Sequence, residues 1–145
     1  MRRAGRGDPR RVRRLTSQIG RQGVISADDS ASLVDYSQID SLLEAAGRDG
    51  VVAILDAFWR STDDLSKRLQ MEVQECSFTE AARTSHAVKG SAANVGAQTL
   101  AAAARDIESC CKAGDADGAL KALNRLLDAY RSTRIALTER VAAFG

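Results

Sequence analysis

Apolar residues recur at the spacing of an α-helix along most of the chain after residue 38. The stretch 39–46 has its apolar residues on one face and is followed by Gly47, a residue type that commonly ends helices. From Arg48 to about Val73 the helical spacing continues for 26 residues, or about 39 Å of helix. We therefore predict a short helix followed by a long one.

A third helix is predicted to begin after Ser77. Ser77 and Glu80 have the spacing of a capping box, in which the two side chains satisfy backbone N–H groups at a helix N-terminus. This helix is expected to end near Gly96. Its apolar residues fall on one side and define the face that should point into the core: Ala81, Val88, Ala92 and Val95.

Two further helices complete the pattern. The first runs from Gln98 to about Lys112 and the second from about Ala119 to Phe144. In the last helix, side chains recur in alternating steps of three and four, the spacing of a seam that packs in bundles and coiled coils. The seam consists of Leu120, Leu123, Leu127, Tyr130, Arg134, Leu137, Val141 and Phe144. Arg134 interrupts it with a charge.

The composition agrees with an all-α protein. Hydrophobic residues make up 44% of the chain and aromatic residues only 4%, which suits helix packing better than a sheet. No apolar run reaches the 18 residues that a membrane span needs, and no secretory leader precedes the charged start. The three cysteines are an odd number and two are adjacent, which argues against a disulfide framework. We expect a cytoplasmic protein without membrane contact.

The first 30 residues differ from the rest in charge. They hold eight of the 21 basic residues, all arginine, but only three of the 19 acidic ones, and few apolar residues that could be buried. We interpret residues 1–30 as a disordered Arg-rich tail and residues 31–145 as the folded domain. A tether to nucleic acid is the alternative use of such a tail, but we expect a solvated tail and no nucleic-acid partner.

The chain has a single histidine, His86, and its helical position predicts that it faces solvent, opposite the apolar face. Its neighbours three, four or seven residues away on the same face are two cations and three small residues: Ala82, Arg83, Lys89, Gly90 and Ala93. Gly90 is unexpected, because glycine inside a helix costs roughly 1 kcal/mol relative to alanine and the periodicity does not require it. The glycine indicates a surface that another molecule approaches closely.

The run HAVKGS at residues 86–91, followed by Val95-Gly96 and another helix, resembles the histidine-containing phosphotransfer (HPt) domain of bacterial phosphorelays. The resemblance extends over about residues 35 to 144. It implies an antiparallel up-down-up-down four-helix bundle with a short additional N-terminal helix. It also implies that His86 relays a phosphoryl group between the aspartates of response-regulator receiver domains.

The resemblance assigns roles to individual residues. His86 is the phosphoryl acceptor, while Lys89 and Arg83 place positive charge where phosphoryl oxygens gather. Gly90 leaves room for the aspartyl phosphate, and the five neighbours of His86 form the expected docking surface. Glu108, 22 residues after the histidine, takes the place of a polar residue that bonds the second ring nitrogen, where a carboxylate would fix the tautomer.

Partners and cofactors are implied in the same way. We expect a monomer that meets receiver domains and a hybrid sensor histidine kinase, with Mg²⁺ held by the receiver. No metal or cofactor is expected on this chain, since one histidine and scattered cysteines cannot close a zinc shell. No nucleotide-binding signature is found, so we expect no kinase activity. Two alternatives are a helical adaptor or inhibitor that is not phosphorylated, and a nucleic-acid-binding protein driven by the Arg-rich tail.

Overall fold

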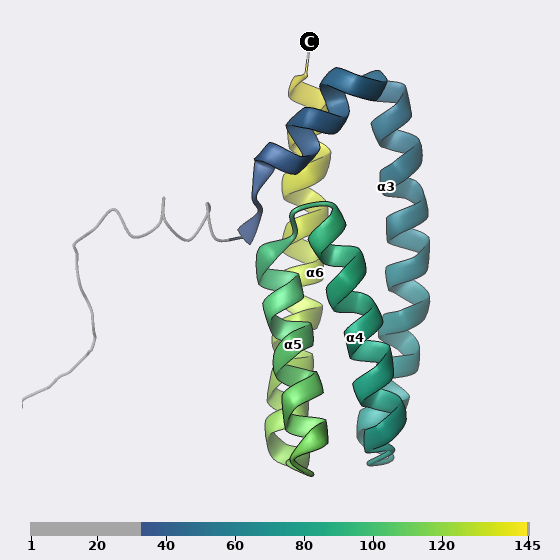
Figure 1. The fold of residues 1–145 in the computed structure, drawn as a ribbon, viewed down its shortest axis with the longest axis vertical. Helices are drawn as coiled ribbons and strands as arrows, with labels where there is room; N and C mark the ends of the chain where they lie inside the picture. Colours follow the sequence, from purple (N-terminus) through teal and green to yellow (C-terminus); the bar gives the residue numbers. More distant parts are fainter. Residues whose placement is uncertain (1–32, 145) are drawn as a thin grey trace, which may run out of the picture. The chain divides into compact units, whose positions relative to one another are not determined.

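The computed structural model describes residues 33–144, and this part of the chain contains helices and no strand. The elements are α3 (Tyr36–Gln74), α4 (Phe78–Asn94), α5 (Gln98–Lys112) and α6 (Ala116–Ala143). Figure 1 shows that successive helices run in opposite directions. Each helix packs against two others, α3 on α4 and α6, and α5 on α4 and α6, which closes an antiparallel four-helix bundle. The expected fold is confirmed.

Gly47 divides α3 into a short and a long helix. Its φ of 75° and ψ of 175° are not helical, and the chain turns there from residues 36–46 into the long helix, as Figure 1 shows at one end of the bundle. The short helix is fixed to α6 by Arg140, whose guanidinium donates to both carboxylate oxygens of Asp40 and lies over the ring of Tyr36. The predicted break at Gly47 is confirmed.

Gly96 brings the start of α3 onto the turn between α4 and α5. It has a φ of 75°, and a side-chain Cβ there would lie 2.3 Å from the carbonyl oxygen of Asp35. The close approach allows a hydrogen bond between the two backbone segments, in which the N–H of Asp35 donates to the Gly96 carbonyl at 2.7 Å. A glycine is therefore needed both for the left-handed backbone and for the contact.

The core is built mainly from aliphatic side chains of all four helices. Fully buried examples are Leu43, Leu69, Leu100, Ile107, Leu126 and Leu137. Three threonines and two serines are also buried, namely Thr62, Ser66, Thr84, Ser85 and Thr133. The side-chain hydroxyl of Ser85 donates to the carbonyl of Ala82, so this polar group is satisfied within its own helix.

The seam predicted for α6 is wrong in part. Leu120 and Phe144 are 42% and 37% exposed and Arg134 is exposed, whereas the buried face includes small residues outside that seam. These are Ala119, Ala122, Ala129 and Thr133. The physical reason is that α6 packs against both α3 and α5, so it buries a face wider than a single line, and small side chains allow close approach.

The structure also explains Arg134 and corrects the capping that was expected at the start of α4. The Arg134 guanidinium lies 5.3 Å from the centroid of the Trp59 ring, a cation–π contact at the bundle surface.

At α4 the helix begins after Ser77 as predicted, but the Ser77 side chain makes no capping hydrogen bond. The backbone N–H of Ser77 donates instead to the Glu72 carbonyl, so the tight turn from α3 positions this residue.

Two further sequence expectations concern the N-terminal residues and membrane-spanning helices. The interpretation of residues 1–30 as a disordered tail lies outside the described residues. None of the helices within residues 33–144 combines the length and apolar character needed to cross a membrane.

Candidate functional site

His86 lies on the exposed face of α4, in the middle of the helix. Its side chain is 65% exposed, while Ala81, Val88 and Ala92 on the opposite side are buried in the core. The burial of that opposite face fixes the rotation of α4 and therefore holds the imidazole toward solvent. The predicted orientation of His86 is confirmed.

Glu108 reaches His86 from the neighbouring helix α5. The Nδ1 atom of His86 lies 3.3 Å from Oε1 and 3.2 Å from Oε2 of this carboxylate. Ile107 beside it is fully buried, so α5 has a fixed rotation that presents Glu108 toward α4. An ionised carboxylate only accepts hydrogen bonds, so in the neutral imidazole the contact assigns the ring proton to Nδ1 and leaves Nε2 with its lone pair.

Two lysines share the Glu108 carboxylate with His86. The Nζ atom of Lys89 lies 3.3 Å from Oε1, and that of Lys112 lies 3.1 Å from Oε2. Burial alone would raise the pKa of Glu108, but the hydrogen bonds from Lys112, His86 and Lys89 outweigh it and lower the pKa to about 2. Glu108 is therefore ionised at neutral pH.

The space beside the imidazole is a shallow hollow of about 510 Å³. Its lining consists of Ala82, Arg83, His86, Glu108 and Lys112. Small and flexible side chains thus surround the exposed ring, and the charges that face it are two cations and one carboxylate. An anionic group attached to Nε2 would find positive charge within this hollow.

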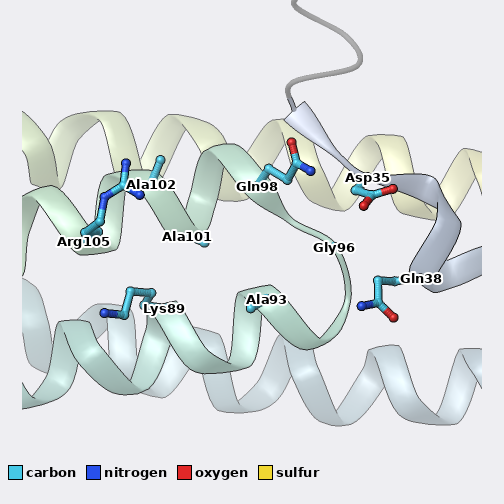
Figure 2. Close-up of a pocket in the computed structure, with 9 residues that line it drawn as sticks. All are labelled: Asp35, Gln38, Lys89, Ala93, Gly96, Gln98, Ala101, Ala102 and Arg105. Carbon is cyan, nitrogen blue, oxygen red and sulfur yellow. The ribbon is translucent and has the colours of Figure 1, made fainter.

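Lys89 lines a different pocket, of about 340 Å³, between α4, α5 and the start of α3. Figure 2 shows Lys89 and Arg105 near one end of this pocket and Asp35 and Gln38 near the other, with Ala93 on the α4 wall. This pocket and the hollow at His86 both lie where α4 and α5 meet. Lys89 of the pocket and His86 of the hollow contact the same carboxylate, that of Glu108.

Gly90 leaves the surface next to His86 open. A Cβ atom added there would have no heavy atom within 4 Å, so neither packing nor backbone geometry requires glycine. Ala93 is exposed and Ala82 is half-buried on the same side of α4. Positions 82, 90 and 93 therefore place only small side chains beside His86 on this face of α4.

The model of the Hpt domain family matches residues 53–142, which run from the long part of α3 into the last turns of α6.

The chain belongs to the Hpt domain family.

Solved structures give the same fold at low sequence identity. Histidine-containing phosphotransfer protein B from Pseudomonas aeruginosa is similar with a TM-score of 0.72 and 22% identity, over 79% of this chain and 99% of that one. A histidine-containing phosphotransfer protein from maize gives 0.66 and 24%, over 81% and 94% of the two chains. One from Medicago truncatula gives 0.67 and 20%, over 83% and 90%. No curated protein sequence matches the chain.

This Hpt domain functions in histidine phosphotransfer within phosphorelays, in which its partners are receiver domains and kinases. Its sequence-predicted site residues do come together: Glu108 contacts both His86 and Lys89, and Arg83 lines the hollow at the imidazole. Sequence reasoning missed Lys112. Its position four residues after Glu108, on the same face of α5, was the signal that could have found it.

Proposed function

We propose that His86 accepts the phosphoryl group from the aspartyl phosphate of one receiver domain and passes it reversibly to the aspartate of another. The observation that supports this most is the exposed imidazole whose Nδ1 is held by Glu108. The protein acts as a monomeric relay without kinase activity of its own.

The Nε2 atom of His86 is the nucleophile. Its lone pair forms the new P–N bond while the P–O bond to the aspartate breaks, and the electron pair of that bond stays on the departing carboxylate. The imidazole keeps its proton on Nδ1 and becomes positively charged. Glu108, ionised and in contact with Nδ1, stabilises this charge and holds the ring in one orientation.

The face around His86 receives the receiver domain. Gly90, Ala82 and Ala93 present little bulk, so a partner surface can approach the ring closely and exclude water from the transferring group. Arg83 and Lys89 add positive charge near the equatorial oxygens. We place the Mg²⁺ that transfer needs in the acidic pocket of the receiver and assign no ligand for it on this chain.

The cytoplasm is the compartment that we propose for this relay. All three cysteines have unpaired thiols, including Cys76, which is exposed. Thiols of this kind persist in a reducing compartment. The kinase that supplies phosphate to the first receiver is proposed to be a hybrid sensor histidine kinase.

Transfer of radiolabelled phosphate tests the proposal. The chain would be incubated with a panel of phosphorylated receiver domains and Mg²⁺, beside the variants His86→Gln and Lys121→Ala, the second altering an exposed lysine on α6. We expect an acid-labile, base-stable label on the wild type and on Lys121→Ala, and none on His86→Gln. Stable receiver binding with no label on the wild type would instead indicate an unphosphorylated adaptor.

A further inference from the structure

We propose that Lys112 binds the oxygens of the phosphoryl group on His86, and that Glu108 holds this lysine ready for that role. The inference rests on the proposed function of His86. It concerns a residue outside the 86–91 motif, on the neighbouring helix α5.

The placement of Lys112 relative to His86 is the first argument. The Lys112 ammonium and the His86 ring contact the same carboxylate oxygen, Oε2 of Glu108, at 3.1 and 3.2 Å. Lys112 also lines the hollow beside the imidazole. Lys89 contacts the other oxygen, Oε1, and lines the separate pocket toward the start of α3. Of the two lysines on Glu108, Lys112 is the one on the side of the hollow.

The electrostatics of the phosphorylated state are the second argument. A phosphoryl group brings a charge of about −1.5 to −2 and three acceptor oxygens. It would arise next to Glu108, whose low pKa keeps it negative at neutral pH. The repulsion between these like charges is offset by a nearby cation, and Lys112 both contacts the carboxylate and lines the hollow.

The freedom of Lys112 is the third argument. Its side chain is 67% exposed, whereas the Glu108 side chain is 12% exposed, so Lys112 is the solvent-facing partner of this i,i+4 ion pair. Its ammonium can therefore turn from Glu108 toward the phosphoryl oxygens, where it exchanges one anionic partner for another. Glu108 would still keep its contacts with His86 and with Lys89, which is only 34% exposed.

Phosphorus NMR of the phosphorylated chain tests this role without a receiver domain. Phosphoramidate serves as donor: Nε2 of His86 attacks its phosphorus, the P–N bond of the donor breaks, and ammonia leaves. The pH midpoint at which the phosphoryl group takes up its proton is then read from the ³¹P shift. A nearby cation lowers this midpoint, so Lys112→Ala should raise it by roughly half a pH unit, whereas Lys112→Arg and the control Lys121→Ala should leave it unchanged.

A second pair of variants separates a direct contact from an effect through Glu108. In a Glu108→Gln background, Lys112→Ala should still raise the midpoint, because the lysine acts on the phosphoryl group itself. An unchanged midpoint in either background overturns the role of Lys112 while the wild type remains phosphorylated. Absence of phosphate on the wild type, or equal phosphate on His86→Gln, contradicts the proposed function and the role of Lys112 together.

Discussion

The Nδ1 atom of His86 lies 3.2 Å from Oε2 of Glu108, across the interface between α4 and α5. This contact links the only histidine of the chain to a carboxylate that is ionised at neutral pH. A carboxylate orients the ring as a neutral amide could, but it would also stabilise the positive charge that the ring carries in the proposed phosphorylated state. The charge of Glu108 should therefore matter to the reaction as well as its position.

Replacing Glu108 by Gln keeps a hydrogen-bond acceptor for Nδ1 and removes the charge. Hydrogen bonds to charged groups contribute about 1 kcal/mol more than neutral ones, so transfer from a phosphorylated receiver should slow about fivefold. Glu108→Ala, which removes the acceptor as well, should slow it further. Single-turnover transfer rates measure both effects, and equal rates for Glu108→Gln and the wild type would show that the charge is not used.

Glu108 should also make the stability of the bundle depend on pH. Its pKa of about 2 in the folded chain lies below the ordinary value of 4.5, so its contribution to stability is complete above about pH 4.5 and is lost as the pH falls toward 2. The free energy of unfolding of the wild type should exceed that of Glu108→Gln at neutral pH, and the two should converge on acidification. Urea titrations at several pH values measure this. Glu139→Gln, which changes an exposed carboxylate on α6, should show no such convergence.

Gly90 should separate stability from transfer. A side chain at this position meets no neighbouring atom, so Gly90→Gln should keep the fold and stabilise α4 by up to about 1 kcal/mol. The same side chain would stand one turn from His86 in the path of the receiver, and transfer should fall at least tenfold. Gly90→Ala is the matched control with little added bulk. Melting temperature and transfer rate are compared, and full transfer by Gly90→Gln would refute close approach over this face.

Tyr130 should affect stability alone. Its hydroxyl donates to Asp63 at 2.7 Å and lies 3.0 Å from the carbonyl of Trp59, which joins α6 to α3. Burial, together with the bond to Asp63, raises the pKa of Tyr130 well above its ordinary value. Tyr130→Phe should lower the free energy of unfolding by about 1–2 kcal/mol. Transfer by the folded variant should equal that of the wild type.

The features that the sequence predicted depend on local pattern. The burial of Ala81, Val88 and Ala92 follows from the periodicity of one helix, and this was enough to predict that His86 faces solvent. The break at Gly47 is likewise a local property of a single residue. Such features can be obtained without knowing how the helices pack.

The features that the sequence missed depend on neighbouring helices. The buried face of α6 is set by contact with both α3 and α5, which the spacing of large residues such as Leu120 does not record. The charge of Arg134 in the α6 seam is explained only by its cation–π contact with Trp59, which lies 75 positions earlier in the chain. The position of Lys112 beside His86 likewise becomes evident only once α5 is packed against α4.

The atom that carries the phosphoryl group is the most direct test of the account. ¹⁵N and ³¹P NMR of the chain after reaction with phosphoramidate would show which nitrogen of His86 is bonded to phosphorus. We predict phosphorus on Nε2 and a proton on Nδ1, next to Glu108. Phosphorus on Nδ1, or a phosphoryl signal that persists in His86→Gln, would contradict the account.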